Sequence, residues 1–241
     1  MKAMICRLEI RMLGPFSVRA DGAELTETAP RAGRMWRLLQ MLAQRDGQPV
    51  STDELVASLW SEAETDNPLS ALQSLVYRLR SLLAARCGAD VEFIRYANEG
   101  YSWNTAAPCF LDTRRFTQLA RSAEALISDD PARARSLYAE ALGLFRGEFL
   151  AGSALDPWAV SASSYYKALH ADCVGRLCEL LRAQEDWETM AQIADAAISM
   201  DFYEEDFHYF FLLALARQRR YAQLKAHYEY YRLSLAHNFG A

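Results

Sequence analysis

Polar side chains able to contact nucleic acid follow one face of a predicted helix at residues 68–86. Asn67 is a suitable N-cap, and Pro68 suits the first turn, where its missing N–H costs nothing. At about 100° per residue, one face carries amide, hydroxyl, phenol and guanidinium groups, namely Ser70, Gln73, Ser74, Tyr77, Arg78, Arg80 and Ser81. These groups suit base edges and phosphates in a major groove. The alternative is an ordinary amphipathic helix whose polar face is only solvated.

The other face of the same helix is apolar. Its members recur at i, i+3 and i+4 spacing, and they are Leu69, Leu72, Val76, Leu79 and Leu83. This stripe is predicted to pack into a core and to leave the polar face outside.

Short strands and two helices are predicted before this helix. Apolar and polar residues alternate over 7–12 and again over 16–19, before an Asp21-Gly22 turn. Helical spacing of apolar residues predicts a helix over 31–44. Ser51 and Glu54 form a capping box that opens a short helix ending near residue 60.

Two strand-like runs, 91–96 and 101–104, follow the polar helix and enclose a loop at 97–100. Two helices, a loop, a third helix and a hairpin are the order of a winged helix-turn-helix, in which the third helix enters the groove beside the hairpin wing. The sheet before the first helix resembles the OmpR-like subclass.

Strand signals vanish from Ala106 onward, and helices are predicted over 112–126, 131–145, 158–183, 187–199, 203–218 and 221–237. Trp187 and Tyr221 each open a helix after a polar turn and lie 34 residues apart, which is the tetratricopeptide period. Met190 and Leu224 stand where that repeat usually has a small residue, so helix pairs are expected and the exact repeat type is left open. The aromatic run over 207–213 is predicted to pack between helices, with a peptide-binding groove as the alternative.

The predicted fold is therefore mainly α with a small β part. A winged helix-turn-helix is expected over residues 1–105, and an all-α tetratricopeptide-like helical repeat domain over residues 106–241.

No catalytic, metal or cofactor chemistry is predicted. The five cysteines include no C-x-x-C pair, and the four histidines lie in the helical half without a clustered carboxylate motif. No Gly-rich phosphate loop, nucleophile elbow or H-E-x-x-H motif occurs. The longest apolar run, 209–216, is too short to span a membrane, and no signal peptide is visible, so a cytoplasmic protein that is not an enzyme is expected.

Charge partly opposes nucleic-acid binding. Residues 1–104 hold 12 Lys and Arg against 13 Asp and Glu, whereas DNA-binding domains usually present a basic face. The charges are therefore expected to segregate, with one face formed by Arg31, Arg34, Arg37, Arg78, Arg80, Arg86 and Arg95. The alternative is a protein-interaction scaffold whose winged helix no longer binds DNA.

The two halves together resemble the bacterial transcriptional activator domain proteins, which include the Streptomyces antibiotic regulatory protein family. The resemblance covers nearly the whole chain and rests on segments 8–18, 49–60, 67–83, 98–103, 156–181 and 203–231. It implies a transcriptional regulator, most often an activator, that binds double-stranded promoter DNA as a homodimer or as paired copies. It also implies that the helical domain contacts a partner protomer or RNA polymerase.

The resemblance also implies roles for individual residues. Gln73, Ser74, Tyr77 and Arg78 would face bases or phosphates, and Arg80 would approach the DNA backbone. Arg95 and Asn98 on the wing would touch the minor groove, Ser51 and Thr52 would open a helix whose amides receive a phosphate, and Arg34 would join the basic face. Many members carry an arginine where this chain has Leu69 and Ser70, so the sequence specificity of the family does not transfer.

Overall fold

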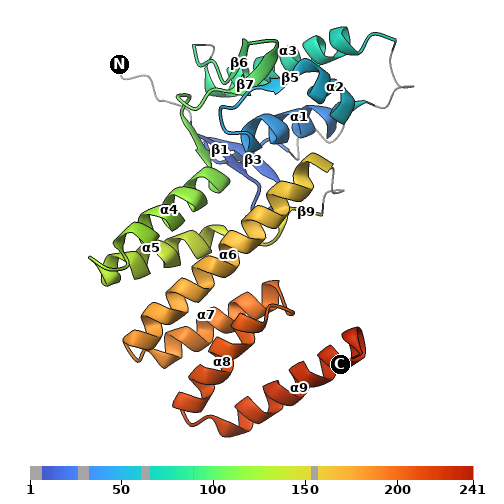
Figure 1. Ribbon diagram of the computed structural model, residues 1–241. Coiled ribbons are helices and arrows are strands. Elements are labelled where there is room, and N and C mark those ends of the chain that lie inside the picture. Colours follow the sequence, from blue (N-terminus) through green and yellow to red (C-terminus); the bar gives the residue numbers. More distant parts are fainter. Residues whose placement is uncertain (1–6, 27–32, 61–65, 89, 153–156, 241) are drawn as a thin grey trace. The chain divides into compact units, whose positions relative to one another are not determined.

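The protein is mainly helical with a small β part, as predicted, and the strands of the described residues form three small sheets (Figure 1). A computed structural model describes residues 7–26, 33–60, 66–88, 90–152 and 157–240. By their contacts these residues group into two compact units: one is Met1–Arg115 with Arg146–Tyr166, and the other is Phe116–Phe145 with Lys167–Ala241. The predicted division at residue 105 remains a prediction, and each unit is described by itself.

The first sheet of the N-terminal unit has the order β4 (Ala23–Glu24), β3 (Ser17–Ala20), β1 (Leu8–Arg11) and β8 (Cys109–Leu111). Antiparallel pairing of β1 with β3 confirms the predicted strands. Alternation along β1 places Leu8 and Ile10 in the core, with no exposed surface, while Glu9 and Arg11 are partly exposed.

Two strands after residue 106 contradict the expectation that strands end there. β8 pairs in parallel with β1, and β9 (Phe149–Ala151) pairs in parallel with β2 (Gly14–Pro15). Each of these late strands has three residues, which is too short to show a period of two. Their pairing depends on partners more than a hundred residues away, which local spacing does not reveal.

A buried carboxylate fastens the start of the fourth helix to the N-terminal sheets. Asp112, 1% exposed, accepts backbone hydrogen bonds from Met12 at 2.8 and 2.9 Å, Leu13 at 2.9 Å and Thr113 at 2.8 Å. Burial raises the pKa of this carboxyl group above its ordinary value, against the opposing effect of these amides.

Three helices form the middle of the N-terminal unit: α1 (Gly33–Gln44), α2 (Thr52–Leu59) and α3 (Pro68–Cys87). Each packs on the other two, around Leu38, Leu42, Leu55 and Leu79, all with no exposed surface. The expected start of the first helix at residue 31 lies outside the described residues. A third sheet of order β5 (Val50–Ser51), β7 (Gly100–Trp103) and β6 (Ile94–Ala97) completes the winged helix-turn-helix order.

The helices predicted after residue 106 are confirmed within two residues at each end. They are α4 (Asp112–Leu126), α5 (Pro131–Leu144), α6 (Pro157–Ala183), α7 (Trp187–Met200), α8 (Glu205–Arg217) and α9 (Tyr221–Phe239). Because α7 and α9 begin at residues 187 and 221, the 34-residue spacing is that of successive helix pairs. α8 packs on both of them. Its side chains Phe207 and Phe210 are buried, which confirms that these two aromatics belong to the core.

Candidate nucleic-acid interface

Helix α3 forms where its start signal and apolar stripe predict. Asn67 Oδ1 accepts a hydrogen bond from the Ser70 amide at 3.1 Å, and Pro68 occupies the first turn. The predicted stripe members Leu72, Val76, Leu79 and Leu83 are all 2% exposed or less. The helix therefore has one fixed buried face, and its polar face lies outside.

The assignment of Leu69 to this stripe was wrong, because its side chain is 52% exposed. Leu75, 2% exposed, is buried in its place. Leu69 and Leu75 lie about 60° to opposite sides of Leu72 around the helix axis. The buried face is thus rotated toward Leu75, and Leu69 joins the exposed side.

The polar face of α3 is available to an external partner. Gln73, Ser74, Tyr77 and Arg78 are all exposed, and the phenol-bearing side chain of Tyr77 is 72% exposed. Within the described part of the chain, Arg78 makes no hydrogen bond or ion pair. An amide, a hydroxyl, a phenol and a guanidinium therefore project from successive turns of one capped helix.

The predicted wing is a hairpin of β6 and β7 with a two-residue loop. Asn98 and Glu99 have φ values of 50° and 58°, the left-handed pair of a type I′ turn, whose twist suits two antiparallel strands. Gly100 follows the turn, and a Cβ atom there would lie 2.5 Å from the carbonyl oxygen of Val50 on β5. Glycine is required at this position because strand β5 approaches so closely.

Two hydrogen bonds join the wing to the helices. The Thr52 amide, at the start of α2, donates to the Glu99 carbonyl at 3.1 Å. Arg80 Nη2 on α3 donates to the Ile94 carbonyl of β6 at 2.8 Å. The structure thus brings Ser51, Thr52 and Arg80 together with the wing.

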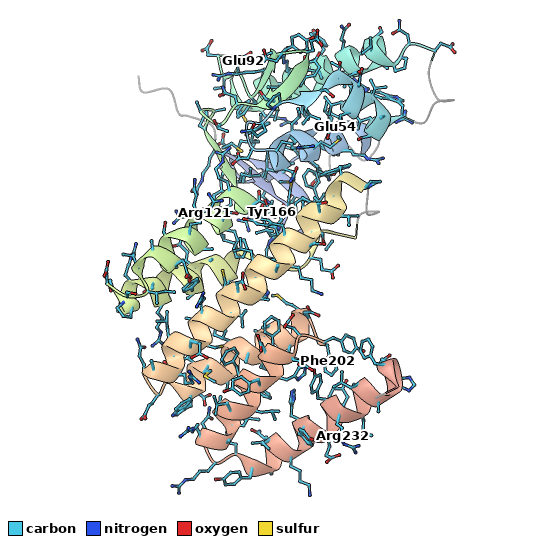
Figure 2. The ribbon with its side chains drawn as sticks, in the orientation of Figure 1. Glu54, Glu92, Arg121, Tyr166, Phe202 and Arg232 are labelled. Atoms are coloured by element: carbon cyan, nitrogen blue, oxygen red, sulfur yellow. The ribbon has the colours of Figure 1, made fainter. Side chains whose placement is uncertain are left out.

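The start of α2 has fewer vacant donors than the sequence suggested. Ser51 Oγ accepts from the Glu54 amide at 3.1 Å, and the Thr52 amide is used by the wing. The side chain of Glu54, labelled in Figure 2, is also engaged, because its Oε1 accepts a hydrogen bond from Arg45 Nη2 at 2.6 Å. Two of the first three amides of α2 therefore already have acceptors.

The expected basic face is only partly assembled. Arg95 Nε lies 3.7 Å from Glu92 Oε2, so the wing arginine has an acidic neighbour (Glu92 is labelled in Figure 2). The Arg34 guanidinium lies over the Trp60 ring, 5.9 Å from its centroid. Arg31 lies outside the described residues.

Sequence reasoning missed two exposed groups beside this face. Leu69 offers an apolar contact of the kind that reads a thymine methyl group. Tyr96 on the wing is 57% exposed, and its ring centroid lies 4.9 Å from that of Tyr101 on the paired strand. The alternation of side chains along the hairpin could have indicated that Tyr96 is exposed. No feature of the sequence distinguished Leu69 from the buried residues of the stripe.

The described residues form neither a cluster of metal ligands nor a membrane-spanning helix. Among the described residues, no group of three His, Cys, Asp or Glu side chains is placed to hold a metal ion. None of the described helices is both long enough and apolar enough to cross a membrane.

Two protein-family models match the chain. The bacterial transcriptional activator domain matches residues 111–241, and the family described as transcriptional regulatory protein, C terminal, matches residues 27–103. The second match contains α1, α2, α3 and the wing, and the first contains α4 to α9.

The chain is similar to two curated regulatory proteins of Streptomyces coelicolor. Transcriptional regulator RedD is 34% identical over 145 residues, which cover 59% of this chain and 40% of RedD. Regulatory protein AfsR is 33% identical over 146 residues, which cover 60% of this chain and 14% of AfsR. The matched region therefore spans less than half the length of either relative.

One solved structure covers 98% of this chain and 62% of its own chain, with a TM-score of 0.77 and 21% identity. It is Mycobacterium tuberculosis EmbR in complex with a low-affinity phosphopeptide. At this identity the likeness shows the fold alone.

Proposed function

This chain belongs to the bacterial transcriptional activator domain family, a family of transcriptional regulators and not of enzymes, and we propose that it activates transcription by docking α3 in the major groove of promoter DNA. The observation that carries the proposal is the exposed face of α3. Gln73 can pair with adenine, Arg78 with guanine or phosphate, and Tyr77 and Ser74 with the backbone.

The remaining residues have supporting roles in the proposed complex. Arg80 holds the wing against α3 through Ile94, and its other nitrogens approach the DNA backbone. Asn98 at the wing tip reaches toward the minor groove, and Arg95 joins it once phosphate competes with Glu92. Ser51 and Thr52 position the start of α2 beside the backbone, and Arg34 acts from α1.

The helical unit is proposed to hold a protein partner, either a second protomer or RNA polymerase. This is supported by α9, which buries no residue. Its large exposed side chains are Tyr221, Tyr228, Tyr230, Leu233 and Phe239. Activation would then consist of recruiting that partner to the promoter.

The test compares variants by fluorescence anisotropy with a labelled duplex from upstream of the protein's own gene. Arg78→Ala should weaken binding by about 1–3 kcal/mol, roughly 5- to 150-fold, if Arg78 reads a base. The control is Arg121→Ala, an exposed arginine on α4 (Figure 2), which should leave affinity unchanged. Equal losses for both variants would refute docking through α3, and an equal loss on random DNA would assign Arg78 to phosphate.

A further inference from the structure

A groove of about 490 Å³ lies among α7, α8 and α9 in the C-terminal unit. Helix α7 contributes Glu188, Gln192 and Asp195, while α8 contributes Phe211 and α9 contributes His227. Stacked helix pairs present such concave surfaces to extended ligands. Six of the nine residues that line it are polar or charged, so a ligand with charged and hydrogen-bonding groups can find partners there.

The α7 side of the groove is acidic. Glu188 and Asp195 are seven residues apart, so they share one helix face at a separation of about 10 Å. An extended peptide covers that distance in about three residues. Gln192 lies between the two acids and donates through Nε2 to Glu188 Oε1 at 3.4 Å, and its own Oε1 can accept from the peptide backbone.

The only basic side chain lining the described groove is already engaged. Arg220 Nη1 lies 3.7 Å from Glu188 Oε2, and Arg220 Nε donates to Gln223 Oε1 at 2.6 Å. Asp195, by contrast, has no hydrogen-bond or ion-pair partner for its carboxylate among the described residues. The uncompensated charge of the groove is therefore negative and lies at the Asp195 end.

Burial lowers the pKa of His227, which disfavours a compensating positive charge on it. The Phe202 carbonyl can only accept, so His208 Nε2, 2.6 Å away, must donate to it. His208 Nδ1 then accepts from His227 Nε2 at 2.8 Å, which holds His208 as the neutral imidazole. Burial lowers the pKa of both histidines below the ordinary value, which also favours their neutral forms. Phe202, in the turn before α8, is labelled in Figure 2.

We infer that this groove binds an extended segment of a partner protein through an arginine side chain that pairs with Asp195 and stacks on Phe211. Arginine fits better than lysine, because a planar guanidinium can stack on an aromatic ring while it pairs with a carboxylate. An acidic or phosphorylated segment would meet Asp195 as a like charge. The inference concerns protein recognition and does not depend on DNA binding by α3.

The test is an NMR titration of the isotope-labelled protein with the probe peptide acetyl-Ala-Ala-Arg-Ala-Ala-amide. Saturable amide shifts are expected at groove residues such as Gln192, Asp195 and Phe211. The same peptide with Glu in place of Arg should give none. Because an exposed ion pair is a modest interaction, Asp195→Asn should weaken the arginine peptide about two- to fivefold.

Two further variants sharpen the result. Asp129→Asn removes the same charge from an exposed loop outside the groove and should change nothing. Ala226→Trp fills the groove from α9 and should abolish the saturable shifts, with the thermal midpoint showing that the variant is folded.

The inference is overturned if the arginine and glutamate peptides bind alike, or if Asp195→Asn binds as tightly as the wild type. Absence of saturable shifts up to the solubility limit of the arginine peptide also overturns it. Since no DNA is present, none of these outcomes bears on the DNA-binding proposal.

Discussion

Acidification should destabilise the C-terminal unit through one buried histidine. His170 on α6 is 6% exposed, its ring stacks on Phe145 at 4.1 Å between centroids, and Phe207 meets it edge-on at 6.0 Å. Burial lowers the pKa of His170 to about 4, although Asp201 acts in the opposite direction.

As the pH falls, the unfolded chain takes up the proton on His170 before the folded chain does. Above pH 6.5 His170 is neutral in both the folded and the unfolded chain, so it does not lower the free energy of unfolding. As pH falls through 6.5 the unfolded chain is protonated while the folded chain is not, so the free energy of unfolding decreases until the pH reaches about 4. With pKa values of 6.5 and about 4, the loss at pH 5 is about 2 kcal/mol, and it approaches about 3 kcal/mol at lower pH.

The assay is urea unfolding at pH 8 and pH 5, for the wild type and for His170→Phe, which keeps an aromatic ring and removes the titration. The variant should lose about 2 kcal/mol less than the wild type between the two pH values. His170→Gln provides a second nontitrating variant if the larger ring disturbs packing. The same pH dependence in all three proteins would show that His170 is not held neutral by burial.

Three other predictions concern packing and access. Leu79→Ala, which removes buried methyl groups from the inner face of α3, should cost about 2–5 kcal/mol in urea unfolding, and a loss below about 1 kcal/mol would contradict its burial. Gly100→Ala should destabilise the wing by about 1–3 kcal/mol because its Cβ atom meets the Val50 carbonyl; an unchanged midpoint would disprove that close approach. Cys173 and Cys178 are buried and burial raises the pKa of each thiol to about 12, so iodoacetamide should modify them only after unfolding, and rapid labelling of the native protein would contradict this.

The helices were predictable from sequence because their signals are local. Asn67 and Pro68 mark the start of α3, and Trp187 and Tyr221 mark the starts of α7 and α9. Apolar spacing within each helix repeats over several turns, which makes the assignment secure. The wing was predictable for the same reason, since its two strands and loop are adjacent in the chain.

Long-range pairing and the rotation of buried faces were not predictable. Strands β8 and β9 form because they pair with β1 and β2. A segment of three residues is too short to carry a sequence pattern that predicts such a pairing. Leu69 fits an apolar stripe in sequence, yet the buried face of α3 is set by how the helix meets α1 and α2. The engagement of Arg34 with Trp60 likewise depends on tertiary packing.

The most direct test of DNA binding through α3 is an anisotropy titration of the wild-type protein against promoter and random duplexes at two salt concentrations. We expect tighter binding to the promoter and an affinity that falls steeply with salt, because phosphate contacts release counterions. A folded protein that binds neither duplex at low salt would contradict DNA binding through α3. That result would favour a role in which the winged helix docks proteins instead of DNA.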